Sequence, residues 1–273
     1  MAGITERVYP KEMDAHAMDN IQGIMYKVFT TRYKVARDWL RSHFGSREIR
    51  ILDIACGSGY GSEILSDLGE VTGVDIDKET VEYARKNYSN GRTAFLEGNA
   101  DDASFLRTLG HFDAVVSLAT VEHVAEPYSY MNWIRKAIGP RGAAVVCFPS
   151  VVTMDWAAPH HKRDISKPTA RKLFYNTGFE IKKSFYQNHK LDIRNLINEV
   201  SHDDNQIPVP RLKEWAKYFL LNPHHLLLRI YEITIGGGVH FGDQEYLLLP
   251  KPEAEFDAIK VRGSRPGLEE SYG

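Results

Sequence analysis

The sequence has few cysteines, no excess of charge of either sign and no long apolar run. Two cysteines, Cys56 and Cys147, are too few for a disulfide framework and lack the spacing of a zinc site, so we expect no metal and a reducing compartment. With 34 basic against 36 acidic residues, no chain-wide attraction to nucleic acid is expected. The N-terminus lacks the apolar core of a secretion signal, and no stretch reaches the about 20 apolar residues of a membrane span. We therefore expect a cytoplasmic protein that contacts no membrane.

The composition is that of a folded globular chain. Hydrophobic side chains make up 43% of the 273 residues and charged side chains 26%, which excludes disorder as the main state. A chain of this length can bury about three quarters of its unfolded surface. We expect residues 1–273 to form a single domain.

Short apolar runs suited to buried parallel strands alternate with amphipathic segments suited to helices. Strands are predicted at 49–55, 70–76, 93–97, 112–118 and 142–148, and helices between the first two strands, at 78–88 and at 127–138. Strands that alternate with helices predict an α/β fold, a Rossmann-like doubly wound sheet with helices on both faces.

Segments on either side complete the expected organisation. Residues 1–46 are predicted to hold one or two N-terminal helices, before a cofactor-binding core at 47–189 that ends with a helix at 167–177 and a strand at 180–187. Residues 190–243 are predicted to be a helical insertion, and 244–273 a last strand (244–250) and tail. Turn residues (Pro208, Pro210 and Gly236–Gly238) bracket an aromatic group (Trp215, Tyr218 and Phe219) in the insertion. It is predicted to be a lid or a subunit contact, with core packing as the alternative.

The segment ILDIACGSGYG, residues 51–61, places three glycines between a strand and a helix. Glycines there let the backbone turn sharply and approach a ligand closely, although taken singly they can be simple turn residues. Asp75 ends the next strand, where a carboxylate can accept hydrogen bonds from both hydroxyls of a ribose. Together these features predict a nucleoside-binding site.

Two details of the loop bear on which nucleoside it binds. A dinucleotide loop prefers G-x-G-x-x-G, whereas Ser62 stands where the third glycine would be. Asp53 lies inside the first strand, where a dehydrogenase usually keeps an apolar residue and where a carboxylate can serve a cationic ligand. Both details favour a nucleoside cofactor other than a nicotinamide dinucleotide.

With LDIACGSGYG followed by VTGVDID, the chain resembles the class I S-adenosylmethionine-dependent methyltransferases, in particular their small-molecule, glycan and natural-product branch. The resemblance implies a seven-stranded sheet with an antiparallel last strand, and S-adenosylmethionine as cofactor. It implies that Asp53 holds the methionine end, that the backbone at Ala55, Gly57 and Gly59 contacts the carboxylate, and that Asp75 holds the ribose. It further implies that Ile76 packs on the adenine, that Asn99 and Ala100 recognise its edge, and that Leu118 and Ala119 border the methyl group.

The chain departs from the family at two of these positions. The family commonly has Asp where this chain has Asn99, so Asp101 is an alternative for the adenine edge. Ala55 replaces a frequent glycine, and we expect its backbone to keep a negative φ because a methyl group is poorly tolerated otherwise.

On the acceptor side, the resemblance places SLATVEHV, residues 117–124, beside the transferred methyl group. His123 is the predicted general base, with His160 as the alternate, because both follow strands at the carboxyl edge of the sheet. The competing interpretation is that His123 orients the neighbouring helix. Residues 160–183 carry an excess of basic side chains that could attract a phosphorylated or nucleotide-linked acceptor, unless they form a solvated helix face.

These expectations combine into one predicted activity, the O-methylation of a small polar acceptor such as a sugar or glycoside. The alternatives are an RNA-modifying or N-methylating enzyme of the same fold, a nucleoside-binding regulator without catalysis, and a nicotinamide-dependent oxidoreductase. A homodimer stays open.

Overall fold

The structure is a computed structural model that describes residues 9–12, 21–149, 162–163, 165–191 and 239–257, together with 220, 221, 223, 226, 227, 230 and 231. The helices of four or more residues are α1 (Ile21–Phe44), α2 (Tyr60–Leu65), α3 (Lys78–Tyr88), α4 (Ala103–Thr108), α5 (Pro127–Ile138) and α6 (Lys167–Asn176). The strands are β1 (Ile49–Ile54), β2 (Gly69–Asp75), β3 (Thr93–Glu97), β4 (Ala114–Leu118), β5 (Ala143–Pro149), β6 (Phe179–Leu191) and β7 (Val239–Pro250).

The strands form one seven-stranded sheet in the order β3-β2-β1-β4-β5-β7-β6. Strands β1 to β5 pair in parallel, whereas β7 runs antiparallel to both β5 and β6. The predicted doubly wound fold with an antiparallel last strand is confirmed. The strand order reverses between β1 and β4, and in open α/β sheets ligands bind outside the carboxyl ends of the strands at such a point.

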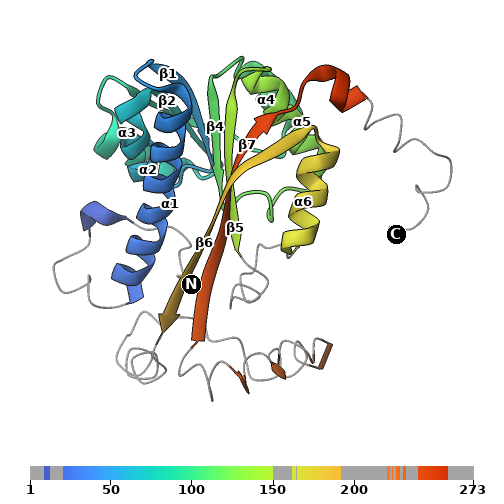
Figure 1. Ribbon diagram of the computed structural model, residues 1–273. Coiled ribbons are helices and arrows are strands. Elements are labelled where there is room, and N and C mark those ends of the chain that lie inside the picture. Colours follow the sequence, from blue (N-terminus) through green and yellow to red (C-terminus); the bar gives the residue numbers. More distant parts are fainter. Residues whose placement is uncertain are drawn as a thin grey trace.

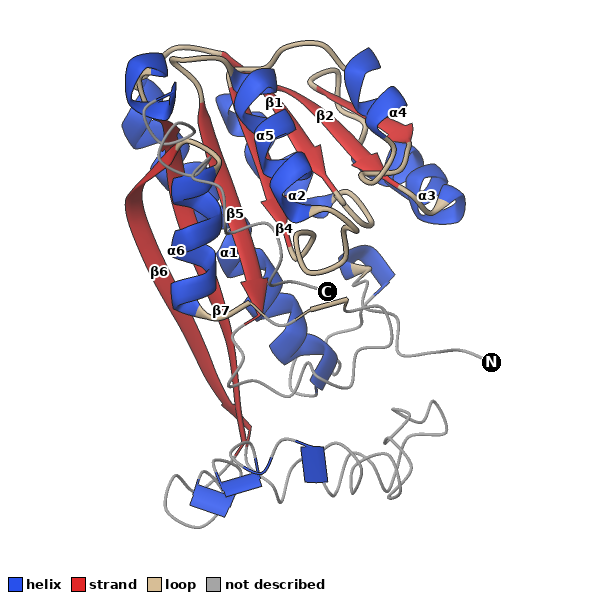
Figure 2. Ribbon diagram, turned by 90° about the vertical axis from the view of Figure 1, so that its right-hand side faces the viewer, coloured by secondary structure: helices blue, strands red, loops and turns tan. Residues whose placement is uncertain are grey.

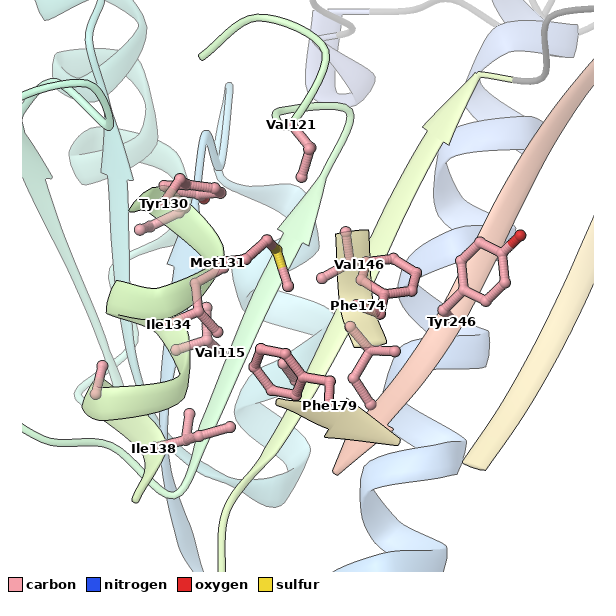
Figure 3. Close-up of a cluster of buried hydrophobic side chains, with 14 of the residues drawn as sticks. Val115, Val121, Tyr130, Met131, Ile134, Ile138, Val146, Phe174, Phe179 and Tyr246 are labelled. Carbon is pink, nitrogen blue, oxygen red and sulfur yellow. The ribbon is translucent and has the colours of Figure 1, made fainter. Parts of the chain in front are cut away.

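Helices cover both faces of the sheet because its strands are apolar on both sides. Helices α1, α2 and α3 lie on one face and α4, α5 and α6 on the other (Figure 1). On the first face, Ala36 and Leu40 of α1 pack against Val116 and Val145. On the second face, α5 and α6 contribute the large buried side chains shown in Figure 3, including Met131, Ile134 and Phe174. This packing holds the strand ends in fixed positions.

Strands β6 and β7 form an antiparallel pair that continues past the ends of the parallel strands (Figures 1 and 2). The pairing of β5 with β7 ends at Pro149, opposite Asp243, while β6 and β7 stay paired as far as Leu191 and Val239. The predicted limits of the insertion, 190 and 243, are therefore wrong at both ends. The strand ends were missed because their polar side chains lack the pattern of a buried strand. Trp215, Tyr218 and Phe219 lie outside the described residues.

Helix α4 was not predicted, because it has six residues of which only Leu106 is buried. Of the region expected to hold N-terminal helices, the structure describes a 3-10 turn, η1 (Pro10–Glu12), and the 24-residue α1. Among the described residues, no helix has both the length and the apolarity that a membrane crossing requires.

Candidate active site

After β1 the chain turns sharply through the glycine loop before α2 begins. Gly57 and Gly59 have φ values of 55° and 93°, in the left-handed region that favours glycine. A Cβ atom at Gly59 would lie 2.7 Å from the Cβ of Ala84 and 3.0 Å from the ring of Phe95, so this glycine permits close packing. A Cβ atom at Gly57 would meet no described atom within 4 Å. The loop thus leaves open space at its turn, as a bound ligand would require.

Two alanines share this unusual backbone conformation. Ala55, at the end of β1, has a φ of 60°, and Ala119, at the end of the neighbouring β4, has a φ of 51°. The expected negative φ of Ala55 is wrong. The left-handed conformation costs about 1–2 kcal/mol for a residue with a Cβ atom, and hydrogen bonds from Cys56 N to Val74 O (3.0 Å) and from Ala119 N to Cys147 O (2.8 Å) hold the turns in place. Such strain concentrates at functional sites, and here it occurs at two of the three alanines predicted to contact the cofactor.

Asp53 is fully buried and held by two side-chain donors. The hydroxyl of Ser62 donates to Oδ2 at 2.6 Å, and that of Tyr33, from α1, donates to Oδ1 at 3.2 Å. Burial raises the pKa of Asp53 to about 7, while these two hydrogen bonds act in the opposite direction. Tyr33 was not predicted, since its contact with Asp53 joins two separate elements. A carboxylate in this setting gains from a cationic ligand, which would favour its charged form.

Asp75 ties the glycine loop to the end of β2. Its Oδ2 accepts a hydrogen bond from Gly57 N at 2.9 Å, and its Oδ1 accepts one from Asp77 N at 3.0 Å. A carboxylate offers about four lone-pair sites, so both oxygens can accept further donors. Ile76, the next residue, is 60% exposed, an unusual setting for a large apolar side chain beside a polar site. The two side chains suit a ligand with hydroxyl groups at one end and an apolar ring at the other.

The segment after β3 holds the predicted adenine-edge residues. The Asn99 side chain accepts a hydrogen bond from Asp101 N at 2.8 Å, which fixes the turn. Asp101, the alternative for the same role, accepts from Ala125 N at 2.7 Å and from Lys162 Nζ at 2.9 Å. Its carboxylate is therefore engaged with the loop after β4, and the choice between Asn99 and Asp101 stays a prediction.

The loop after β4 carries the predicted acceptor-side residues. Leu118 and Ala119 end the strand, and the half-buried His123 donates its backbone N–H to Thr120 O at 2.9 Å. Because β1 and β4 are neighbours, this loop lies at the same edge as Asp53 and the glycine loop. His160 lies outside the described residues. The structure thus brings all the predicted cofactor residues and His123 to the carboxyl ends of β1 to β4.

A second group of buried polar side chains joins α1 to β5 and β7 and was not predicted. Arg32 forms an ion pair with Asp243, with Nη1 3.6 Å from Oδ1, and also contacts Cys147. Glu245 pairs with Cys147 in the sheet register and is fully buried, and within the described structure its carboxylate oxygens have no hydrogen-bond partner. Burial raises the pKa of Glu245 well above its usual range, with Arg32 opposing and Asp243 adding to the shift. This group, the Arg32 cluster (Arg32, Asp243 and Glu245), lies where α1 packs beside β5 and β7.

Three basic side chains of 160–183 make separate contacts. Lys162 pairs with Asp101, Arg163 binds backbone carbonyls, and Lys167 lies over the ring of Tyr186, with 4.7 Å from Nζ to the ring centroid. Within the described residues, no three His, Cys, Asp or Glu side chains are arranged to hold a metal ion. The attraction of a phosphorylated acceptor to this stretch stays a prediction.

Comparisons with known proteins agree with this geometry. Residues 52–146 match the family described as "Methyltransferase domain". The matched residues make up about a third of the chain. The match includes the second half of β1, all of β2 to β4 and most of β5. These strands carry the glycine loop, Asp53, Asp75 and the loop with His123.

Two curated relatives and one solved structure show how far the likeness reaches. A Mycolicibacterium smegmatis protein named a probable S-adenosylmethionine-dependent methyltransferase is 26% identical over 156 residues, covering 55% of this chain and 58% of its own. The mitochondrial ubiquinone biosynthesis O-methyltransferase of Schizosaccharomyces pombe is 33% identical over 103 residues, 36% of each chain. This chain therefore matches less than two thirds of either relative's length. A Thiobacillus denitrificans S-adenosylmethionine-dependent methyltransferase, solved with S-adenosylhomocysteine, superposes with a TM-score of 0.50 at 14% identity, covering 81% of this chain and 91% of its own, and supports the fold.

Proposed function

We propose that this chain is an S-adenosylmethionine-dependent methyltransferase that methylates a hydroxyl group of a small polar acceptor such as a sugar or glycoside. The observation that carries the proposal is the pair of buried carboxylates, Asp53 and Asp75, at the ends of adjacent strands around a loop in the left-handed conformation. The names of the two curated relatives support the cofactor and an oxygen as the methylated atom.

The residues at the site fit this cofactor. Asp53 would face its methionine end and Asp75 its ribose hydroxyls, while the exposed Ile76 would pack on the adenine. The open space at Gly57 leaves room for the backbone to approach the carboxylate. The remaining contacts are assigned to Ala55, Gly59, Asn99, Ala100, Leu118 and Ala119.

S-adenosylmethionine, when bound, supplies a methyl group on a positively charged sulfur, which an acceptor oxygen can attack in line. The task of the protein is to align the acceptor hydroxyl, exclude water and remove the proton. We assign proton removal to His123, because it lies on the loop that follows β4 and an imidazole can accept a proton near neutral pH. His160 stays the alternate.

Mass spectrometry of small molecules that co-purify with the protein tests the cofactor and acceptor together. We expect S-adenosylmethionine or S-adenosylhomocysteine and, with methyl-deuterated S-adenosylmethionine, a product that carries the labelled methyl group. A co-purifying nicotinamide dinucleotide would instead support an oxidoreductase. Salt-sensitive retention of RNA would support an RNA-modifying enzyme.

The assignment of His123 has its own test. If proton removal limits the rate, His123→Ala should lower the single-turnover rate by roughly 10²- to 10⁴-fold with little change in cofactor affinity. A rate within about threefold of the parent at every pH from 6 to 9 would remove His123 from the proposed mechanism.

A further inference from the structure

Three loop segments that are distant in sequence meet beside the candidate site. They are the turn after β3 (residues 99–101), the loop after β4 (residues 119–125) and residues 162–163, which precede α6. The first carries the residues assigned to the adenine edge, and the second carries Ala119 and His123. Contacts among the three segments therefore connect the cofactor side with the acceptor side.

Asp101 is the link between the first two segments. Its backbone N–H donates to the Asn99 side chain at 2.8 Å, so its position depends on that residue. Its carboxylate accepts the N–H of Ala125 at 2.7 Å and the ammonium group of Lys162 at 2.9 Å. One side chain thus holds both the turn after β3 and the end of the loop after β4.

Arg163 and Lys162 hold the same loop from its other side. The guanidinium of Arg163 donates to the carbonyl of Ala125 at 2.8 Å and also to the carbonyls of Val121 and Val124. The backbone N–H of Lys162 donates to the carbonyl of Glu122 at 3.0 Å. A guanidinium presents its donors in a rigid fork, so it can fix several carbonyls of one turn together. The position of His123 in the chain lies between these anchored residues.

We propose that Asp101, Lys162 and Arg163 are positioning residues through which cofactor binding orders the acceptor-facing loop, residues 119–125. A ligand that fixes the turn at Asn99 and Ala100 also fixes the position of Asp101. The Asp101 carboxylate then restrains Ala125, whose backbone N–H it accepts. The loop is then held more firmly once the cofactor has bound, so cofactor binding favours acceptor binding. This inference rests on the proposed function for the cofactor contacts.

Hydrogen exchange with S-adenosylhomocysteine as the probe tests the link, because exchange reports local opening of individual segments. Saturating S-adenosylhomocysteine should slow exchange in residues 119–126 of the unaltered protein by about fivefold or more, a typical size for coupling between sites. In Asp101→Ala this slowing should fall below about twofold. Residues 55–61 should be protected by the ligand in both proteins, which shows that it binds.

Asp102→Ala is the matched control. Asp102 is the neighbouring acid and accepts hydrogen bonds from Ser104 and Phe105, so its loss disturbs the start of α4 without removing a described contact to the loop after β4. We expect this variant to keep the full ligand-induced slowing in residues 119–126. Asp101→Asn, which preserves the side-chain volume, should lie between the two because it weakens the contact with Lys162.

Each outcome separates the inference from the function on which it rests. If Asp101→Ala keeps the ligand-induced slowing of the unaltered protein, or if Asp102→Ala loses it equally, the link through Asp101 is overturned while the cofactor assignment stands. If S-adenosylhomocysteine leaves residues 55–61 unchanged in the unaltered protein, the proposed function fails first, and the link fails with it.

Discussion

The proposed cofactor side of the sheet edge and the Arg32 cluster hold their buried acids in different ways. On the cofactor side, Asp53 and Asp75 receive hydrogen bonds from hydroxyl and backbone N–H donors, mostly within the unit from β1 to the start of α3. In the Arg32 cluster, Asp243 and Glu245 lie near one cation, Arg32, supplied by α1 from the other end of the chain. The first region is organised by local sequence, whereas the second exists only once distant elements have packed together.

The comparison has an energetic consequence. A buried charge is tolerated when donors or counter-charges surround it, and removing a partner leaves the full cost of desolvation. Asp53 is held by two uncharged donors, the hydroxyls of Ser62 and Tyr33, so removing one of them leaves the other hydrogen bond in place. Arg32 lies near two carboxylates, so losing it removes the described counter-charge from both of them.

The largest effect is expected for Arg32→Met, which keeps most of the side-chain volume but removes the cation. The free energy of unfolding should fall by about 3–5 kcal/mol in denaturant titrations, the range for breaking a buried ion pair. The affinity for S-adenosylhomocysteine should change by less than about threefold, because the cofactor contacts lie elsewhere.

Arg37→Met on the same helix is the control for Arg32→Met. Arg37 pairs with the exposed Asp38 and Asp67, and such pairs contribute about 0–1 kcal/mol. Equal losses of stability in the two variants would show that the Arg32 pair contributes no more than an exposed ion pair.

Gly59→Ala should have the next largest effect, and it should be confined to the cofactor side. A methyl group there would clash with Ala84 and Phe95, and the alanine would have to adopt the positive φ of Gly59. We therefore expect a loss of about 3 kcal/mol in unfolding free energy and no measurable cofactor binding. Gly91 also has a positive φ, 82°, but a Cβ atom there would meet no described atom within 4 Å. Gly91→Ala should therefore lower the free energy of unfolding by about 1 kcal/mol and leave cofactor binding intact. Normal cofactor binding by Gly59→Ala would argue against the glycine loop as the site.

These contrasts also explain what the sequence could predict. The strands β1 to β5 and the residues Asp53, Gly57, Gly59 and Asp75 are encoded in short runs in which buried strands, glycines and acids follow one another. The left-handed φ of Ala55 could not be predicted in this way, because the turn geometry overrides the ordinary preference of alanine. The fold was therefore predictable from local sequence pattern. The φ of Ala55 was not, because residue type does not reveal the backbone constraint at that turn.

The Arg32 cluster shows the opposite case. Arg32, Asp243 and Glu245 carry no local motif, and their association depends on packing α1 against β5 and β7. The extensions of β6 and β7 were missed for a related reason, since residues such as Asn188, His189 and Asp243 are polar and stay in strands only because the two strands pair with each other.

A smaller effect should appear in the pH dependence of stability. Since the pKa of Asp53 is about 7 in the folded protein and 3.8 is its reference value, the unfolded state ionises first, so Asp53 makes folding less favourable as pH rises through this interval. The stability of the unaltered protein relative to Asp53→Asn should therefore fall by about 2 kcal/mol between pH 5 and pH 7, as measured by chemical denaturation. A constant difference across this range would mean that Asp53 is ionised in the folded protein throughout.

The smallest effect expected is a gain. Ala55→Gly relieves a left-handed alanine at the start of the loop, so it should raise the free energy of unfolding by about 0.5–1 kcal/mol after the entropic cost of glycine. Ala119→Gly should behave alike. Destabilisation of both variants in thermal or chemical unfolding would show that these backbones are not strained.

Calorimetric titration of S-adenosylhomocysteine and NAD into the protein and into Asp75→Ala tests the central claim most directly. The account predicts that S-adenosylhomocysteine binds and NAD does not, and that Asp75→Ala weakens binding by about 1–3 kcal/mol, the scale of a lost charge-assisted hydrogen bond. Asp77→Ala, which removes the neighbouring helix cap, should bind as the unaltered protein does. Preferential binding of NAD, or equal affinity for S-adenosylhomocysteine with and without the Asp75 carboxylate, would contradict it.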